Sequence, residues 1–202
     1  MPSVNYLESG TSTGFPYVII DDLYDEKELG VIWRDLEYLQ PKLLSPEQTA
    51  AATGDDGNYI KNNKGIFIPD MMELYWVGTK VFQDDLKLLR QHDNWFFKNI
   101  KIVQDSMLVS YYEDGDYYAP HVDSGAITCL TWFYKEPKAF EGGNLCFPEY
   151  DFCVDIKPNR MLAFPACLYH EVPKVTMNDC GKGLGRYCVS QFLLNLRSVE
   201  GV

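Results

Sequence analysis

Residues 185–193 read Gly-Arg-Tyr-Cys-Val-Ser-Gln-Phe-Leu, and this run of aromatic and aliphatic residues favours an extended strand. Because side chains alternate between the two faces of a strand, Arg186 and Ser190 share one face, while Val189 and Leu193 share the other. A guanidinium on the inner face of so apolar a strand is costly unless an anion pairs with it. The stretch therefore predicts one of two arrangements. The arginine either holds a bound carboxylate, with help from a hydroxyl, or pairs with one of the 29 acidic residues of the chain.

Similar short runs, rich in β-branched and aromatic residues, fill the chain from residue 100 onward and are separated by Asp-Gly, Pro-Asn and Gly-Gly turn signals. The runs lie at residues 102–103, 106–112, 126–134, 143–147, 152–156, 160–164, 167–172 and 185–196. So many short strands after a helical first half predict an α+β, mainly β fold. In such a fold, helices pack on one face of an antiparallel sandwich or barrel.

Two amphipathic segments in the first half predict the helices. One spans residues 22–39, with an N-cap from one of the aspartates at positions 21, 22 and 25. The other spans residues 70–92, where Asp70 is the candidate cap. Between them, residues 41–65 are rich in Pro, Ala, Thr, Gly, Asp and Asn and exceed the length of an ordinary connection. We expect this segment to be either a mobile surface loop or a lid near a site.

The composition limits the classes of partner. A chain of 202 residues with 46% hydrophobic content can build one well-cored domain but not two large independent ones. Its 18 basic and 29 acidic residues give a formal net charge of −11. Such an acidic chain argues against nucleic acid or an anionic membrane as the main partner, because phosphate contacts need concentrated positive charge. Small molecules, metal cations and basic peptides stay compatible with it.

The chain shows no sign of a membrane segment or of disulfide bonds. No stretch approaches the roughly 18–20 consecutive apolar residues of a membrane span, and the first residues lack the basic and apolar run of a signal peptide, so we expect a cytoplasmic location. The cysteines form no Cys-x-x-Cys pair and mostly lie in apolar runs, so we expect reduced core residues rather than disulfides or zinc ligands. They are Cys129, Cys146, Cys153, Cys167, Cys180 and Cys188.

The histidines suggest a metal site. His121 and Asp123 stand two positions apart at a predicted strand or its end, so their side chains can converge on one point, and His170 lies on another predicted strand. Two imidazoles and one carboxylate are the ligand set of the facial triad that holds non-haem Fe(II) and leaves positions open for other ligands. A His-x-Asp pair alone is a weak motif, because a histidine in a turn and a capping aspartate give the same pattern.

The order of these motifs resembles a known family. His-x-Asp, a distal His and an Arg on the last long strand resemble the Fe(II)- and 2-oxoglutarate-dependent dioxygenases, in particular the prolyl 4-hydroxylase branch. Residues 112–123, Tyr-Glu-Asp-Gly-Asp-Tyr-Tyr-Ala-Pro-His-Val-Asp, are similar to the Tyr-x-x-Gly…His-x-Asp stretch of collagen-type prolyl hydroxylases. Further segments look like those of the hypoxia-sensing prolyl hydroxylases, at residues 127–130, 142–149, 170–172 and 186–190. Together these segments are far more specific than any one of them.

The resemblance implies a fold and a set of site residues. The expected fold is a double-stranded β-helix, or jelly roll, over residues 105–197, with N-terminal helices packed on one sheet and residues 1–104 as a support region of the same single domain, 1–202. Iron would be bound by His121, Asp123 and His170. The C5 carboxylate of 2-oxoglutarate would pair with Arg186, supported by Ser190, in a pocket lined by Tyr112. Trp132 stands where the hypoxia-sensing enzymes carry a tyrosine that contacts the co-substrate, so we expect a different pocket shape.

The resemblance also implies an activity. With Fe(II), 2-oxoglutarate and O2, the enzyme would hydroxylate a C–H bond and release succinate and CO2. The expected substrate is a prolyl residue of a protein or peptide, and a free amino acid or other small molecule is the first alternative. The second alternative is a non-catalytic β-helix that binds a metal or ligand, which would have no need of an arginine clamp. Nucleic acid and membranes are not expected partners, and the sequence carries no signal for an oligomeric state.

Overall fold

One antiparallel sheet of seven strands forms the larger layer of the protein. The computed structural model describes residues 3–5, 14–49, 53–54, 56–90 and 94–195. Across this sheet the strands follow the order β1 (Ser3–Asn5), β2 (Val18–Asp21), β10 (Arg160–Pro165), β6 (Ile127–Phe133), β13 (Arg186–Leu194), β4 (Gln104–Tyr112) and β3 (Lys64–Phe67). The long strand β13 therefore lies inside the sheet, between β6 and β4.

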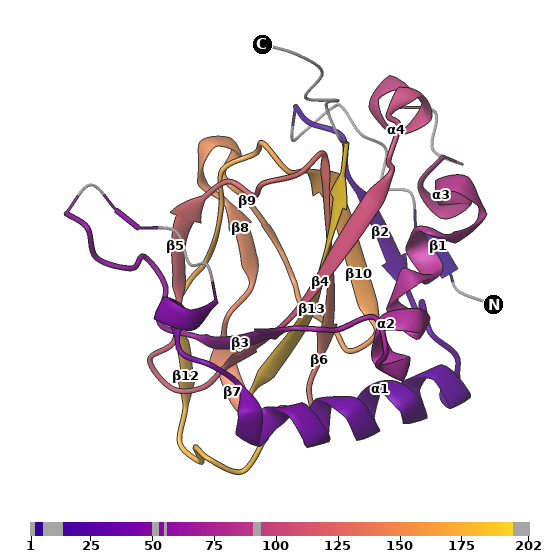
Figure 1. The fold of residues 1–202 in the computed structure, drawn as a ribbon. Coiled ribbons are helices and arrows are strands. Elements are labelled where there is room, and N and C mark those ends of the chain that lie inside the picture. Colours follow the sequence, from indigo (N-terminus) through magenta and orange to yellow (C-terminus); the bar gives the residue numbers. More distant parts are fainter. Residues whose placement is uncertain (1–2, 6–13, 50–52, 55, 91–93, 196–202) are drawn as a thin grey trace.

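A smaller antiparallel sheet forms the second layer. Its order is β5 (Tyr118–His121), β11 (His170–Val172), β8 (Leu145–Phe147) and β9 (Phe152–Val154), and β12 (Val175–Met177) pairs separately with β7 (Phe140–Gly142). One hydrophobic cluster joins the two sheets, since it contains Leu130 and Phe164 of the larger sheet and Leu145 and Val172 of the smaller one. Two antiparallel sheets around a shared core are the predicted double-stranded β-helix (Figure 1).

Helices cover the other face of the larger sheet, as predicted (Figure 1). A second hydrophobic cluster joins Ile32 and Leu36 of the first helix to Val189 and Leu193 of β13. The α-helices are α1 (Glu26–Leu39), α2 (Glu73–Gly78), α3 (Gln83–Arg90) and α4 (Trp95–Asn99), and short 3-10 turns lie at Gln40–Lys42, Pro46–Gln48, Thr79–Val81 and Pro148–Tyr150. None of these helices combines the length and the hydrophobicity that a membrane-spanning helix needs.

Helix α1 confirms one of the proposed N-caps. Asp25 accepts hydrogen bonds from the backbone N–H groups of Lys27 and Glu28, and the Glu28 side chain accepts one from the backbone of Asp25, which together form a capping box. The helix begins four residues later than the sequence pattern suggested, because Asp22 adopts a left-handed conformation, with φ of 55°, that a helix cannot include.

The prediction of one helix over residues 70–92 is wrong. Among the described residues of this range, α2 ends at Gly78, a 3-10 turn follows, and α3 begins at Gln83. Glycine is a poor helix former, and at Gly78 the chain lies so close to Met107 of β4 that a β-carbon would clash. Asp70 is not the cap either, because α2 starts after Met72 and Asp35 of α1 accepts a hydrogen bond from the Leu74 N–H at 2.9 Å.

The prediction for the cysteines holds only in part. Cys129 and Cys188 are buried free thiols, as expected, whereas Cys167 and Cys180 are exposed. Cys146 and Cys153 form a disulfide, which corrects the expectation that all are reduced. The reason is the register of β8 and β9, which places these residues directly opposite each other. Their separation of seven positions, with a turn between them, gives no local motif that reveals the pairing.

We predict that Asp35→Ala destabilises the protein by about 1–2 kcal/mol, because it removes the buried carboxylate that caps α2. Arg34→Ala is the matched control. Arg34 pairs with Asp35 at 2.9 Å, but its side chain is largely exposed, so we expect a much smaller loss. Urea unfolding followed by circular dichroism measures both. Equal effects of the two substitutions would show that the surface ion pair, and not the cap, matters.

Candidate active site

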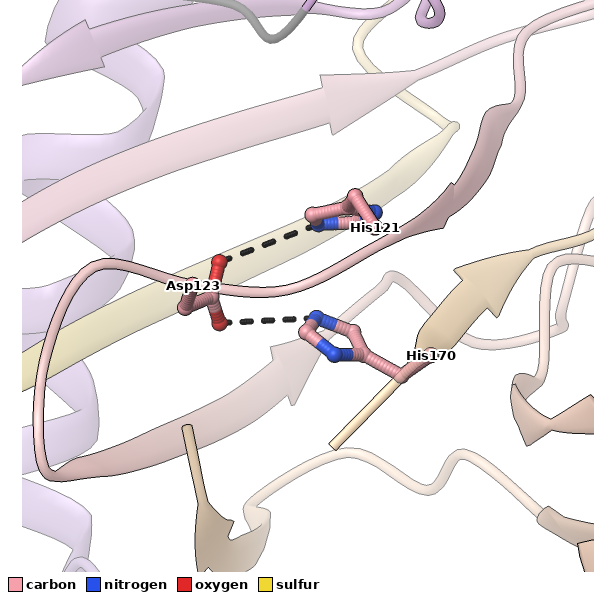
Figure 2. A group of neighbouring side chains, drawn as sticks. All are labelled: His121, Asp123 and His170. Atoms are coloured by element: carbon pink, nitrogen blue, oxygen red, sulfur yellow. Dashed lines mark ion pairs between the residues drawn. The ribbon is translucent and has the colours of Figure 1, made fainter. Parts of the chain in front are cut away.

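The smaller sheet brings the predicted metal ligands together. His121 ends β5 and His170 begins β11, and the antiparallel register places the two residues directly opposite each other. Asp123 follows two positions after β5, where its backbone N–H donates to the Ala166 carbonyl at 3.0 Å. One side-chain atom of each residue lies within 4.8 Å of one atom of the other two. Figure 2 shows the three side chains pointing toward one shared point.

Hydrogen bonds orient these side chains. The Nδ1 atom of His121 lies 2.9 Å from the Ala119 carbonyl oxygen, and Nδ1 of His170 lies 2.9 Å from the Leu168 carbonyl oxygen. Because a carbonyl only accepts, each Nδ1 carries the proton and each Nε2 keeps a free lone pair. Those Nε2 atoms face Asp123, at 3.7 Å from Oδ1 for His121 and 3.4 Å from Oδ2 for His170 (Figure 2). This is the tautomer that a metal-binding histidine needs.

The surroundings keep the site ready for a cation. Burial is the main cause that lowers the pKa of His121 to about 3, with smaller contributions from the neighbouring His170 and Lys61, so the His121 ring is neutral at physiological pH. The Tyr118 ring stacks on the His121 ring at 3.5 Å between centroids. Thr128 of β6 donates its hydroxyl proton to Asp123 Oδ2 at 2.6 Å, which fixes the carboxylate. Sequence reasoning missed Tyr118 and Thr128 in these roles, because neither belongs to the ligand motif.

Arg186 lies in the same region with no partner of its own. It is 1% exposed, and all three guanidinium nitrogens lack a hydrogen-bond partner within the described part of the chain. The internal Arg–carboxylate pair that the sequence left open is therefore absent among the described residues. The guanidinium carbon lies 4.6 Å from the centre of the Tyr112 ring. An unpaired, desolvated guanidinium is a strong site for a carboxylate.

Glycine makes room for this arginine. Gly143, with φ of 70°, lies where a β-carbon would come within 3.0 Å of Arg186 Cδ and within 2.8 Å of a Val175 methyl group. Any other side chain would push the guanidinium stem out of position, and few residues adopt this left-handed conformation. The Gly-Gly pair was visible in the sequence, but its contact with Arg186 depends on tertiary structure.

A cavity of about 50 Å³ connects the metal-ligand candidates to Arg186. Its polar lining includes His121, Asp123, His170, Tyr112, Arg186 and Ser190, which are the six site residues predicted from the sequence. Its apolar lining includes Leu108, Leu130, Leu145 and Val172. Ser190 shares the face of β13 with Arg186, and its hydroxyl lies 3.8 Å from the Cys188 thiol. The cavity therefore offers a metal site at one end and an anion site at the other.

Trp132 does not line this cavity. It is fully buried in the core between the sheets, opposite Cys188 in the β6–β13 register, and its indole N–H has no hydrogen-bond partner among the described residues. The inner wall on β6 is formed by Leu130 instead. On this side, Leu130 therefore forms the surface of the pocket, and the Trp132 indole is buried in the core.

Comparisons with known proteins agree with this geometry. Residues 107–194 match the family model of the 2OG-Fe(II) oxygenase superfamily. No curated protein matches the chain. A prolyl-4-hydroxylase from Pseudomonas putida is similar in structure, with a TM-score of 0.65, 13% sequence identity and coverage of 90% of this chain and 94% of that one.

Further solved structures share the fold. A prolyl hydroxylase from Trichoplax adhaerens, in complex with a peptide fragment of the hypoxia inducible factor oxygen degradation domain, has a TM-score of 0.63 and 16% identity, with coverage of 91% and 84%. A viral collagen prolyl hydroxylase from Paramecium Bursaria Chlorella virus-1, in a 2OG complex, has a TM-score of 0.56 and 14% identity, with coverage of 91% and 98%.

The fold, the triad geometry and the match over the β core lead to one conclusion. Fe(II) and 2-oxoglutarate are the cofactor and co-substrate that go with this ligand set and this family. Residues 107–194, which hold most of the β core, are thus similar to the 2OG-Fe(II) oxygenase superfamily, and His121, Asp123 and His170 are the candidate iron ligands.

Proposed function

We propose that this enzyme hydroxylates a prolyl residue of a protein or peptide. The observation that carries the oxygenase chemistry is the buried, unpartnered Arg186, which lines the same cavity as the His121, Asp123 and His170 cluster. The prolyl substrate is supported by three of the similar structures, which are named prolyl hydroxylases. One of them holds a peptide, which supports a macromolecular substrate over a free amino acid.

The residues present fit a ferrous ion. Two imidazole nitrogens with free lone pairs and one carboxylate form a donor set that suits Fe(II), and leave room for further ligands on the cavity side. Both rings have their second nitrogen on a backbone carbonyl, and Thr128 donates a hydrogen bond to the carboxylate. We propose that His121, Asp123 and His170 hold the iron.

The residues also fit 2-oxoglutarate, which is a dicarboxylate. Its distal carboxylate would take the unsatisfied N–H groups of Arg186, with the Ser190 hydroxyl on the same strand face. The Tyr112 ring, packed on the guanidinium, keeps the arginine directed along the cavity. A co-substrate held at Arg186 has its other end directed toward the metal ligands, since both line one cavity.

When bound, iron and 2-oxoglutarate supply the oxidising chemistry that converts O2 and a C–H bond into an alcohol, with succinate and CO2 as by-products. The protein positions the reactants and limits access of water. Leu108, Leu130, Leu145 and Val172 give the cavity apolar walls, which strengthen the Arg186–carboxylate interaction. The backbone carbonyls at Nδ1 of His121 and His170 orient both rings so that their Nε2 atoms face the metal position.

The experiment that tests the proposal measures succinate release across three substrate sets: prolyl peptides, free amino acids and cell extract. We expect Fe(II)- and oxygen-dependent succinate release that rises with a prolyl peptide, and a 16-dalton mass increase on that peptide. Stimulation by a free amino acid alone would overturn the prolyl-peptide assignment. Metal binding without any conversion of 2-oxoglutarate would favour a non-catalytic module.

We predict that His121→Ala and Asp123→Ala each abolish iron-dependent turnover and leave a folded protein, because each removes one of three metal donors. Glu149→Ala, at an exposed carboxylate outside the site, is the control and should keep full activity. Succinate release and circular dichroism measure the two properties. Full activity in either triad variant would reject the metal assignment.

We predict that Arg186→Met raises the 2-oxoglutarate concentration needed for half-maximal turnover at least tenfold, since a buried charge pair that loses one partner costs about 2–5 kcal/mol. The same substitution should leave the ligand-free protein at least as stable as the parent, because it removes an unpaired buried charge. Turnover kinetics and thermal unfolding without ligand measure the two effects. Unchanged co-substrate affinity together with lower stability would make Arg186 a structural residue only.

A further inference from the structure

Lys61 is a buried cation that the proposed iron and co-substrate sites do not use. The residue is 5% exposed, and no described residue forms an ion pair or a hydrogen bond with its ammonium, which is not fully enclosed. The centre of the Tyr118 ring lies 5.4 Å from Nζ. Partial burial lowers the pKa of Lys61 to about 8. Like Arg186, Lys61 is therefore a cation that could bind an anionic ligand.

The backbone places Lys61 beside the triad. Residues 60–62 run antiparallel to residues 117–119: the Ala119 N–H donates to the Ile60 carbonyl at 2.8 Å, and the Asn62 N–H donates to the Tyr117 carbonyl at 3.1 Å. Tyr118, the partner of Lys61 in this bridge, stacks on His121 at 3.5 Å. The Tyr118 ring therefore separates the Lys61 ammonium from His121, a candidate iron ligand. The charge of Lys61 contributes to the lowered pKa of His121.

Lys61 also lines a second, larger space. A groove of about 470 Å³ lies between residues 45–47, residues 58–64 and Tyr117. Lys61 and Lys64 are its cationic groups and Glu47 is its anionic group, while Tyr59 and Tyr117 add aromatic surface. This positive balance contrasts with the net charge of −11 for the whole chain. A positive groove on an acidic protein favours an anionic ligand.

The sequence predicted either a mobile loop or a lid for residues 41–65. Several residues of this segment line the groove. The groove differs from the 2-oxoglutarate pocket, because Arg186 and Ser190 line only the smaller cavity. Lys61 lines the groove, and its Nζ lies 5.4 Å from the centre of the Tyr118 ring, which stacks on His121. The groove is therefore suited to the substrate rather than to the co-substrate.

We propose that Lys61 binds a carboxylate of the substrate, held close to the carbon that is oxidised. This inference rests on the proposed function and narrows its substrate class to anionic substrates. The carboxylate comes either from an Asp or Glu side chain near the target residue of a peptide or from the free carboxylate of an amino acid. The ammonium gains the partner that it lacks in the ligand-free protein, which makes the interaction strong.

The test uses substrate pairs that differ only in charge. One arm compares prolyl peptides that carry Glu or Gln next to the target residue, and the other compares proline with its amide. The variants are Lys61→Met and Lys61→Arg, with Lys157→Met, at an exposed lysine that does not line the groove, as the control. Binding to the Mn(II)- and 2-oxoglutarate-loaded protein is measured by calorimetry, and KM and kcat are measured with the Fe(II) enzyme.

We expect the parent to bind the acidic member of one pair at least tenfold more tightly than its amide. Lys61→Met should remove that preference by raising the KM for the acid, while kcat and the KM for 2-oxoglutarate change little. Lys61→Arg should restore part of the preference, and Lys157→Met should retain all of it. The peptide arm and the amino-acid arm identify the source of the carboxylate.

The opposite results separate the two proposals. An equal affinity of the parent for acid and amide in both arms, or an acid preference that survives in Lys61→Met, would overturn the role of Lys61. If Lys61→Met fails to fold, the same comparison in Lys61→Arg and Lys61→Gln decides. Conversion of 2-oxoglutarate to succinate without added substrate reports on the oxygenase chemistry alone. If the parent protein forms no succinate under any condition, the proposed function is overturned, whereas the anion site is not.

Discussion

The alternation of side chains along β13 is the constraint on which the rest of the structure depends. One face of the strand, with Val189 and Leu193, packs against the helix layer and gives the larger sheet its support. The other face presents Arg186 and Ser190 to the cavity between the sheets. Because the period of a strand is two, a register shift of one residue would place the guanidinium in the helix core and Val189 in the site. Stability and co-substrate binding are therefore coupled through one strand.

Placing Arg186 on this strand lowers the stability of the fold. No described residue supplies the buried Arg186 with a hydrogen-bonded anion, and such a charge is costly in a core. The same lack of an internal partner keeps the guanidinium available, since a nearby carboxylate from the protein would compete with a ligand. Gly143 and the Tyr112 ring hold it in place without neutralising it. The site thus shows a local sacrifice of stability for binding, and the two hydrophobic cores compensate for it.

Sequence reasoning reached the site in two ways. Alternation along a strand placed Asp123 beside His121 and Ser190 beside Arg186, whereas the co-substrate roles, including that of Tyr112, came from the family resemblance. All six predicted site residues line one cavity. Sequence reasoning failed where tertiary contacts decide. The disulfide between Cys146 and Cys153 depends on strand register, and the helix break at Gly78 depends on contact with Met107. Short strands such as β3 and β5 also lack a pattern long enough to detect.

The position of Lys61 is another feature that the sequence does not reveal. In sequence it stands in a polar segment where a lysine is ordinarily a solvated residue. Only the pairing of residues 60–62 with residues 117–119 buries it and brings it one ring from His121. Arg186 lines the inner cavity, and Lys61 lines a separate groove. A dicarboxylate fits the first cation, and the proposed carboxylate of the substrate fits the second, so each of the two anions would have its own binding position.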